Sequence, residues 1–459
     1  MAELNVEQIA AWTGAKILQG RPSLHFTGYS IDSRRVKKGE LFFAVSGERD
    51  GHEFIGHAAQ KGAAGAVVSR KISTLPSRFA VIQVDDTLAA LQSLARSVLE
   101  HHPARVVGIT GSAGKTTTKE FTAFLLAGSY RVMKSEGNYN NHLGLPLSVL
   151  NLQPGHEIAV LEYAMSSPGE ISALTKIAPP DVAVVINVHP VHMEYFDNLN
   201  QIAQAKEEIL HGMKPGGTAI LNQDDPLVRK MSTKKAGKVI RFGTTGKKDI
   251  KAGHIHLEGW EKINFELFYS GKNHPASIPF FNRSYLTDFL AAAAVSLEFS
   301  IPAEDVIARA AGLQPYEMRG RLHFPGKDIK LIDDSYNSSP AALDEALKSL
   351  VLLPGRRKIA ILGDMLELGK NKIQYHLQAG RSAAELGIDL LATVGNLAFF
   401  MAEGAREAGL PAHRVYSYKN SSEGAAEFPS LAEPGDVILV KGSRGIHMEK
   451  ITDALKRIK

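Results

Sequence analysis

A glycine-rich stretch followed by a lysine and three threonines is the part of this sequence best suited to hold phosphate groups. It reads GITGSAGKTTTKE over residues 108–120 and follows a short apolar run. An apolar strand, a glycine turn and a helix in that order leave backbone N–H groups free at the helix N-terminus, where the helix dipole favours an anion. We expect Lys115 to reach the β- and γ-phosphates of a nucleotide and the Thr116 hydroxyl to bind Mg²⁺. The expected phosphate-binding residues are Gly111, Ser112, Ala113, Gly114, Lys115, Thr116 and Thr117.

The match to the usual phosphate-loop pattern is incomplete. Ile109 stands where G-x-x-x-x-G-K-[ST] has its first glycine. The alternative is an ordinary glycine-rich turn between a strand and a helix. The Lys-Thr-Thr sequence directly after Gly114 favours a variant phosphate loop.

Three further side chains are candidates for holding Mg²⁺, which prefers oxygen ligands. Glu162 ends the apolar run AVLE, and its alternative role is that of a solvated carboxylate at a strand end. His192 lies in NVHPVHMEYF, where His189 competes with it and an ordinary loop histidine is the simpler interpretation. From the pattern alone, Lys206 in QIAQAKEEIL is a surface lysine paired with a neighbouring glutamate.

The elements around these residues predict a mostly parallel sheet. Apolar runs at 106–109, 158–162, 182–187 and 218–222 alternate with helical stretches. Glu162, Asn187 and Asn222 end such runs, at the sheet edge where open α/β sheets bind ligands. The stretch 249–279 instead suits antiparallel strands, and a helix is expected over 284–299.

Two more α/β units flank this one, so we expect three domains, at residues 1–101, 102–315 and 316–459. The first has Ser33 and Arg34 near a strand end, where Arg34 is equally well explained as a surface arginine. In the third, polar residues follow the apolar runs in DIKLIDD, KIAILGD and DVILVKG. Such repeated strand ends are typical of a Rossmann-like domain with a polar rim.

The composition excludes several classes of protein. The 459 residues carry a net charge of only +5 and no basic run with interleaved aromatics, which argues against a nucleic-acid partner. The absence of cysteine excludes disulfides and thiolate chemistry. No signal peptide is evident, and the most apolar stretch, FLAAAAVSLEF, is too short to span a bilayer. We therefore expect a monomeric cytoplasmic protein without membrane insertion.

Taken together, these segments resemble the Mur ligases, the ATP-dependent enzymes that form amide bonds in peptidoglycan synthesis. The resemblance covers nearly the whole chain, beginning with DSRRVKKGELFFAVSGERDGHEFI in the first domain. In the second it rests on TGSAGKTTTKE, EGNYNNHLGLPLSVL, SSPGEI, VHMEYF with AKEEIL, and LNQDD. In the third it rests on IDDSYNSSPAALDEAL, ILGDMLELG with His376 after it, and ILVKGSRGIHMEKI. The phosphate loop alone is common to many nucleotide hydrolases, whereas these last three segments are far more specific.

The resemblance implies an ATP-dependent ligase that joins D-alanyl-D-alanine to a UDP-N-acetylmuramoyl-tripeptide. ATP would phosphorylate the C-terminal carboxylate of the tripeptide, and the amine of the dipeptide would then displace phosphate. Lys115, Mg²⁺ and the helix N-terminus would offset the repulsion between the two anions. The implied cofactors are ATP and two Mg²⁺ ions, held by Thr116, Glu162, His192 and a CO₂-derived carbamate on Lys206.

The resemblance also implies roles for residues outside the loop. The catalytic set would be Lys115, His192, Lys206 and Arg321, with Arg321 reaching the ATP phosphates from the third domain. Further nucleotide contacts would come from Asn222, Tyr285 and Asp334. The substrate-binding residues would be Ser33, Arg34, Asn138, Asn141, Asn337, Asp364, Lys441 and Ser443, with Glu367 and Arg444 nearby. Helix capping is the alternative for Asp364 and Glu367. Because nucleotide contacts lie on both sides of residue 316, we expect domain closure about a hinge near Glu317.

Two stretches depart from the family pattern. The usual Gly-x-His-Asn-x-x-Asn stretch that holds adenine is replaced by NRSYLTD, which places Ser284, Tyr285 and Asp288 at the His and Asn positions. Tyr285 could stack on the base instead. Residues 163–167, YAMSS, replace the small and polar residues that usually follow the metal-binding glutamate. The rival interpretations are a Mur-type ligase with another second substrate, a folate polyglutamylating enzyme of the same superfamily, and a non-catalytic nucleotide-binding protein.

Overall fold

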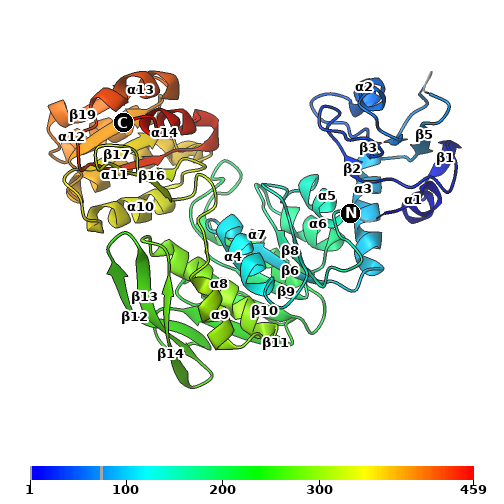
Figure 1. Cartoon of the computed structure of the whole chain (residues 1–459), viewed down its shortest axis with the longest axis horizontal. Coiled ribbons are helices and arrows are strands. Elements are labelled where there is room, and N and C mark those ends of the chain that lie inside the picture. The colour runs from blue at the N-terminus through cyan, green and yellow to red at the C-terminus, as the bar shows by residue number, and fades with distance from the viewer. Residues whose placement is uncertain (1–2, 73–75, 459) are drawn as a thin grey trace.

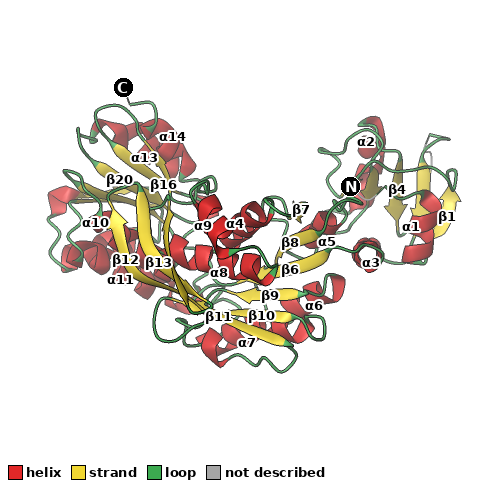
Figure 2. Ribbon diagram, turned by 60° about the horizontal axis from the view of Figure 1, so that its bottom comes forward, coloured by secondary structure: helices red, strands yellow, loops and turns green. Residues whose placement is uncertain are grey.

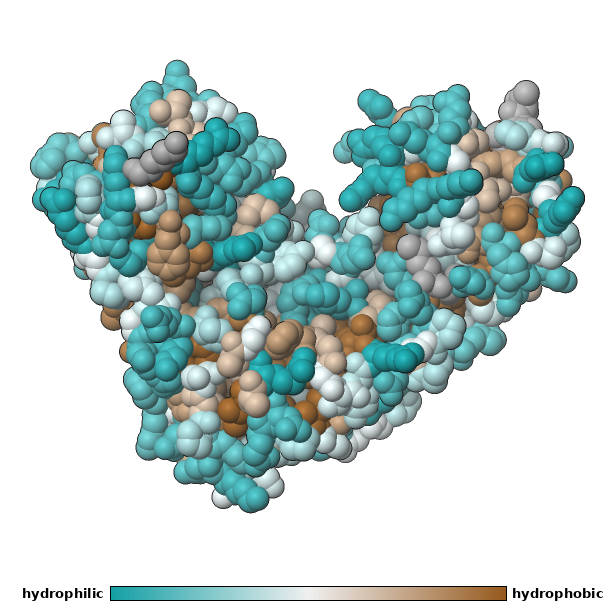
Figure 3. All heavy atoms as spheres, viewed as in Figure 1, coloured by the Kyte–Doolittle hydropathy of each residue, from teal (hydrophilic) through white to brown (hydrophobic). Residues whose placement is uncertain are grey.

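The computed structural model describes residues 3–72 and 76–458 as three α/β domains, each built on one sheet. Figure 1 shows a V, with the central domain at the base and the N- and C-terminal domains as its arms. The predicted fold class is confirmed. In Figure 3 the two arms stand apart above the central domain, with an open hollow between their largely hydrophilic surfaces. No helix in the described ranges combines the length and apolar character needed to cross a membrane.

The N-terminal domain has a five-stranded sheet in the order β1-β5-β4-β3-β2, in which only the β1–β5 pair is antiparallel. Its strands are β1 (Lys16–Gln19), β2 (Tyr29–Ser30), β3 (Leu41–Phe43), β4 (Gly65–Val68) and β5 (Ala80–Gln83). Its helices are α1 (Val6–Thr13), α2 (Ile55–Gln60) and α3 (Thr87–Glu100). The side chain of Asp86 caps α3 by accepting hydrogen bonds from the backbone of Leu88 and Ala89.

The central domain has a nine-stranded sheet in the order β14-β13-β12-β11-β10-β9-β6-β8-β7. Its strands are β6 (Arg105–Thr110), β7 (Val132–Lys134), β8 (Ile158–Glu162), β9 (Val182–Val185), β10 (Thr218–Asn222), β11 (Lys238–Gly243), β12 (Ile250–Glu258), β13 (Lys262–Tyr269) and β14 (Lys272–Ile278). The strands from β7 to β12 are parallel, and the last three form an antiparallel meander, as predicted for 249–279.

Helices cover both faces of the central sheet, with α4 and α8 on one side and α6 and α7 on the other (Figure 2). The helices are α4 (Lys115–Leu126), α5 (Gly144–Val149), α6 (Glu170–Ile177), α7 (Leu199–Gly212), α8 (Ser284–Glu298) and α9 (Ala303–Ala310). Strand β6 lies between β8 and β9, so the loop that follows it emerges beside the ends of both neighbours.

The C-terminal domain has a six-stranded sheet in the order β15-β16-β20-β17-β18-β19, parallel except for the β15–β16 pair. Its strands are β15 (Arg321–His323), β16 (Lys330–Asp334), β17 (Lys358–Gly363), β18 (Leu390–Val394), β19 (Val415–Tyr418) and β20 (Val437–Lys441). Its helices are α10 (Pro340–Leu352), α11 (Lys372–Glu385), α12 (Phe399–Glu407), α13 (Ser421–Glu427) and α14 (Glu449–Leu455). This is the Rossmann-like arrangement that the repeated strand ends predict.

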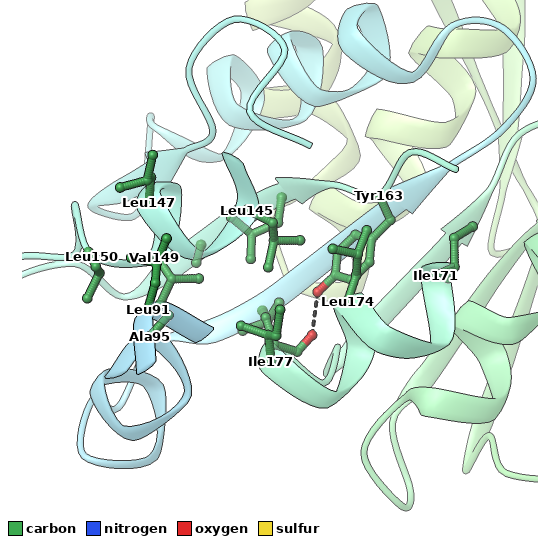
Figure 4. Packing of buried hydrophobic residues seen from close by; sticks show 14 of the residues in the cluster. Leu91, Ala95, Leu145, Leu147, Val149, Leu150, Tyr163, Ile171, Leu174 and Ile177 are labelled. Carbon is green, nitrogen blue, oxygen red and sulfur yellow. Dashed lines mark hydrogen bonds between the residues drawn. The ribbon is translucent and has the colours of Figure 1, made fainter. Parts of the chain in front are cut away.

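The N-terminal and central domains share one apolar core. Figure 4 shows Leu91 and Ala95 of α3 beside Leu145 and Val149 of α5, in the same buried cluster as residues of α6. The C-terminal domain is joined differently: Phe281 of the central domain packs into its core, and Trp260 donates a hydrogen bond of 3.1 Å to the carbonyl of Pro354. These contacts fix the positions of the N- and C-terminal domains relative to the central domain.

Candidate active site

The glycine-rich loop lies between the end of β6 and the first turn of α4, as predicted. Gly114 is the N-cap of α4 and has a φ of +81°, a left-handed conformation that favours glycine. In the described part of the chain, no hydrogen bond reaches the backbone N–H groups of Lys115, Thr116 or Thr117. Three donors at a helix N-terminus therefore remain available to an anion.

Asn187, just beyond β9, holds the loop in place. Its carbonyl accepts a hydrogen bond of 3.0 Å from Ser112 N–H, and its Oδ1 accepts one of 2.9 Å from Ala113 N–H. The Ser112 hydroxyl donates to the carbonyl of His189 at 3.1 Å. The loop is thus shaped by the neighbouring strand end, and not by its own residues alone.

Lys115 folds back over this loop. Its Nζ donates a hydrogen bond of 2.9 Å to the carbonyl of Gly111. Burial lowers the pKa of Lys115, an effect that the charge of Glu162 opposes and that of Arg319 reinforces. The ammonium group lies where it can meet a phosphate bound by the loop.

Thr116 and Glu162 form the oxygen-rich pair that was predicted for Mg²⁺. The Thr116 hydroxyl donates to Glu162 Oε2 at 3.0 Å, and Glu162 is only 3% exposed. Asn140 donates to the other carboxylate oxygen at 2.9 Å. A hydroxyl and a carboxylate beside a phosphate loop suit a hard cation that keeps several waters, so this donor set fits Mg²⁺. Asn140 lies beside the predicted Asn138 and Asn141 but was itself missed.

Lys206 of α7 is buried, with 2% of its surface exposed. The expectation of a surface ion pair is wrong, because Glu207 accepts a hydrogen bond from Ser232 N–H and Glu208 accepts one from Gly169 N–H. Among the described residues, none forms a hydrogen bond or ion pair with Lys206 Nζ. Burial, reinforced by the charge of Lys115, holds the pKa of Lys206 well below its usual value, which favours the neutral amine.

His192 faces the C-terminal domain, and not a cluster of acidic ligands. Its Nδ1 lies 2.5 Å from a carboxylate oxygen of Glu367, and this contact lowers the pKa of Glu367. No group of three or more His, Cys, Asp or Glu side chains in the described ranges is arranged to hold a metal ion. This finding does not exclude a metal site made of Thr116, Glu162, His192 and a modified lysine, because threonine and lysine are not among those four residue types.

The altered adenine stretch takes part in packing. Tyr285 is buried with its ring stacked on Phe280, 4.3 Å between centroids, and its hydroxyl donates to the carbonyl of Arg319. The expectation that Tyr285 stacks on a nucleotide base is therefore not met in this structure, because Phe280 already lies against the ring. Asn222 is also engaged: its amide donates to the carbonyl of Ile186 at 2.8 Å, and its Oδ1 accepts from Asp224 N–H at 3.0 Å.

Asp288, three residues after Tyr285, lies directly against the phosphate loop. It is buried and accepts a hydrogen bond of 3.0 Å from the Thr118 hydroxyl. A Cβ atom on Gly114 would overlap its carboxylate. Burial raises the pKa of Asp288 to about 7, although Thr118 and the charge of Arg319 lower it in part. Asp288 ends the stretch 282–288 that differs from the family pattern, but nothing in the sequence predicted its contact with the phosphate loop.

Arg319, and not Arg321, reaches the loop in this arrangement of the domains. Its Nη2 donates to the Thr116 hydroxyl at 3.3 Å, and its guanidinium lies over the Tyr336 ring at 4.2 Å. Arg321 is exposed at the start of β15. Arg321 was expected to contact the phosphate site, and in this structure it does not. It already pairs with Asp333 in the C-terminal sheet, whereas Arg319 precedes the strand and points towards the central domain.

The predicted residues of the C-terminal domain form two sets of contacts, one around Asp334 and Lys441 and the other around Asp364 and Ser443. Asp334 and Lys441 form an ion pair of 2.6 Å, and Lys441 also donates to the carbonyl of Asn337 at 3.0 Å. Asp364 accepts a hydrogen bond of 2.6 Å from Ala398 N–H, just before α12. The alternative that it caps the helix that follows it in the chain is wrong, because no side-chain cap is present at the start of α11. Burial raises the pKa of Asp364. Ser443 accepts from Leu366 N–H at 2.9 Å.

Asp364 also borders a cavity of about 510 Å³ at the carboxyl ends of β17, β18 and β19. Its other lining residues are Gly395, Asn396, Lys419, Asn420, Ser421, Ser422, Gly445, Ile446, His447 and Lys450.

Among the described residues, the substrate residues predicted nearer the N-terminus form no hydrogen bond with the phosphate loop. Ser33 contacts the His57 ring at 3.0 Å, whereas Arg34 is exposed and pairs with Asp32 at 2.9 Å. Asn141 accepts hydrogen bonds from Leu143 and Gly144 N–H and so caps α5. Asn138 is exposed.

A phosphate loop, an adjacent Thr–Glu pair and a buried lysine of lowered pKa, in a central domain between two α/β arms, define a nucleotide-dependent enzyme of three domains. Successive parts of the chain match the models of the Mur ligase family catalytic domain (25–98), the Mur ligase middle domain (109–296) and the Mur ligase glutamate ligase domain (320–444). The chain belongs to the Mur ligase family.

Relatives and solved structures agree over almost the whole length. The chain is 36% identical to the UDP-N-acetylmuramoyl-tripeptide–D-alanyl-D-alanine ligase of Bacillus subtilis, covering 93% of each chain. It is 33% identical to the ligase of the same name from Escherichia coli, again over 93% of each. A MurF structure from Acinetobacter baumannii superposes with a TM-score of 0.90 at 29% identity, covering 99% of both chains. A MurF ligase from Thermotoga maritima in complex with ADP gives 0.82 at 30% identity, covering 94% of this chain and 97% of the other.

Proposed function

We propose that this chain joins D-alanyl-D-alanine to UDP-N-acetylmuramoyl-tripeptide in peptidoglycan precursor synthesis. The observation that carries the proposal is its similarity, over 93% of both chains, to a ligase named for that reaction. ATP transfers its γ-phosphoryl group to the tripeptide carboxylate. The dipeptide amine then attacks the resulting acyl phosphate, and the C–O bond to phosphate breaks as the amide forms. The proposal includes a cytoplasmic monomer with domains at 1–101, 102–315 and 316–459.

In this proposal the loop N–H groups and Lys115 bind the ATP phosphates, and Thr116 and Glu162 hold Mg²⁺. The free N–H groups of α4 and the 3.0 Å contact between Thr116 and Glu162 support both assignments. When bound, Mg²⁺ supplies positive charge that offsets the repulsion between the carboxylate and the γ-phosphate. Arg319 adds a further positive charge beside Thr116.

The same proposal makes Lys206 the site of a carbamate. Lys206 is buried and has no partner among the described residues, and its lowered pKa favours the neutral amine that CO₂ requires. The amine nitrogen bonds to the carbon of CO₂ and loses one proton, giving an anion with two oxygens that suit a second Mg²⁺. His192 is the other side chain assigned to that ion. Nuclear magnetic resonance of protein equilibrated with ¹³C-labelled bicarbonate should show a carbamate signal that disappears in Lys206→Met and persists in Lys176→Met, an exposed lysine of α6.

The substrates would meet in the hollow between the arms. Ser33, Arg34, Asn138 and Asn141 are proposed for the UDP-linked tripeptide, and the set Asn337, Asp364, Lys441 and Ser443 for the second substrate. Because the arms stand apart, the proposal requires closure about the segment near Glu317. Small-angle scattering should show a smaller radius when nucleotide and tripeptide are present.

A phosphate-release assay tests the function. Release should require ATP, UDP-N-acetylmuramoyl-tripeptide and D-alanyl-D-alanine together, and Lys115→Ala should abolish it. Tripeptides ending in diaminopimelate and in lysine, assayed side by side, identify the third residue. Release with a different second substrate would support another Mur-type ligase, and no release with any combination would refute the proposed reaction.

A further inference from the structure

Arg319 brings a positive charge to the phosphate loop without an acidic partner of its own. In the described part of the chain, its guanidinium makes one hydrogen bond, the 3.3 Å contact with the Thr116 hydroxyl, and forms no ion pair. Its Nε is buried and has no hydrogen-bond partner. A hydrogen bond of 3.3 Å is long for an N–H donor, so it does not by itself fix a long and flexible side chain.

The ring of Tyr336 supplies the other contact of this guanidinium. The central carbon of the Arg319 guanidinium lies 4.2 Å from the ring centroid, well within the range of about 6 Å for attraction between a cation and an aromatic face. The Tyr336 hydroxyl has no hydrogen-bond partner among the residues that the structure describes. The ring face, and not the hydroxyl, therefore holds Arg319.

The backbone around Arg319 is fixed from both domains. Tyr336 N–H donates a hydrogen bond of 3.1 Å to the carbonyl of Met318, and the hydroxyl of Tyr285 in the central domain donates to the carbonyl of Arg319. Met318 and Gly320 have φ values of +57° and +67°, in the left-handed region. A Cβ atom on Gly320 would overlap the Tyr285 hydroxyl. The backbone of this segment is thus closely packed, whereas the direction of the Arg319 side chain depends on Tyr336.

We propose that Tyr336 is a positioning residue that holds the Arg319 guanidinium beside the phosphate loop for contact with the phosphates of ATP. This inference rests on the proposed function, in which Arg319 adds positive charge beside the bound nucleotide. An aromatic ring contacts the face of a guanidinium and leaves the N–H donors along its edge free for phosphate oxygens. An acidic partner would occupy those donors and cancel the charge, so a tyrosine orients this arginine without reducing its affinity for phosphate.

The three groups come from different parts of the chain. Thr116 lies in the first turn of α4, Arg319 lies between α9 and β15, and Tyr336 follows β16 in the C-terminal domain. A shift of the C-terminal domain would carry the ring away from the loop, so the orientation of Arg319 depends on how that domain is docked.

Two substitutions of Tyr336 separate its ring from its hydroxyl, with a matched control. Tyr336→Leu removes the aromatic face, Tyr336→Phe keeps it, and Tyr416→Leu replaces a tyrosine of β19 that is also partly buried. Titration calorimetry with β,γ-imido-ATP, which is not hydrolysed, measures nucleotide binding. Tyr336→Leu should weaken binding by about 3- to 30-fold, the range that a cation–π contact supplies. Tyr336→Phe should retain most of the affinity, and Tyr416→Leu should match wild type.

A double-mutant cycle distinguishes positioning from a general structural effect. If the ring acts through Arg319, Tyr336→Leu should weaken binding by less than about twofold when Arg319→Ala is already present. In steady-state assays, Tyr336→Leu should raise the KM for ATP and leave the KM for the UDP-linked tripeptide unchanged, because the residues proposed for that substrate lie elsewhere. Thermal unfolding of each variant measures any loss of folded protein separately.

The outcomes for the inference and for the proposed function are distinct. An equal loss of nucleotide affinity from Tyr336→Leu with and without Arg319→Ala, or no loss in the wild-type background, would overturn the inference. A loss in Tyr336→Phe as large as that in Tyr336→Leu would also overturn it, because the ring face would then not be the group that matters. Wild-type protein that binds the nucleotide analogue but releases no phosphate with both substrates present would refute the proposed reaction instead.

Discussion

Replacing Gly114 with alanine should damage the phosphate loop for two separable reasons. The first is conformational: at a φ of +81° a Cβ atom meets the backbone, which costs roughly 1–2 kcal/mol. The second is a collision with the buried carboxylate of Asp288. Forcing extra atoms into a packed interior typically costs about 1–3 kcal/mol. The expected total is about 2–5 kcal/mol.

Gly169 provides a control that carries only the first cost. It is the N-cap of α6 with a φ of +86° and a ψ of −14°, close to the +81° and −9° of Gly114. A Cβ atom on Gly169 would meet nothing within 4 Å. Gly169→Ala should therefore lose about 1–2 kcal/mol from backbone strain alone. The difference between the two variants isolates the contact with Asp288.

Thermal unfolding and ADP titration calorimetry measure the two consequences. Gly114→Ala should unfold at a lower temperature than Gly169→Ala and should bind ADP at least about tenfold more weakly, because one lost phosphate hydrogen bond of about 1.5 kcal/mol suffices. Adding Asp288→Ala to Gly114→Ala should recover part of the loss, so the two substitutions would be non-additive. Equal unfolding temperatures for the two alanine variants, with ADP affinity unchanged, would refute the reasoning about the loop.

Three further outcomes are expected. Arg319→Ala should weaken ATP binding more than Arg321→Ala in parallel titrations, because only Arg319 contacts the loop; the reverse order would mean that closure brings Arg321 to the phosphates. Since the pKa of Asp288 rises to about 7 on folding, wild-type stability should fall as the pH rises from about 4 to 7; Asp288→Asn should therefore raise the thermal midpoint much more at about pH 8 than at about pH 4, and an equal effect at the two pH values would contradict the raised pKa. His376→Gln places its amide oxygen near the position of Nε2 and can still accept from Met365 N–H, whereas the shorter His376→Asn cannot reach it, so His376→Gln should show the lower KM for D-alanyl-D-alanine; equal KM values would mean that this hydrogen bond does not shape the proposed second-substrate side of the C-terminal domain.

The sequence was most informative where structure is local. The runs at 158–162 and 218–222 coincide with β8 and β10, because an apolar run bounded by turn residues specifies a buried strand without reference to distant parts of the chain. Lys115 and Thr116 were predicted for the same reason, since strand, glycine turn and helix are consecutive. Glu162 could be added because strand ends of a parallel sheet share one edge.

The site departs from the sequence-based predictions where it depends on contacts between distant segments. Arg319 was missed in favour of Arg321, because only the junction between two domains decides which of two nearby arginines turns towards Thr116. Asn140 was missed between two predicted asparagines, because the turn before α5 selects the one that faces Glu162.

Lys206 illustrates both cases: its helix is a local feature that the sequence predicts, whereas its burial depends on distant segments. Its helix could be predicted, but the glutamates beside it were the natural partners from spacing alone. Only the folded chain assigns those glutamates to backbone N–H groups of other segments and leaves the lysine buried beside Lys115. Consecutive residues thus determined the strands, the loop and the family of this protein. The tertiary structure decided which charges are buried, paired or free, because burial and pairing depend on groups that meet only when the three domains assemble.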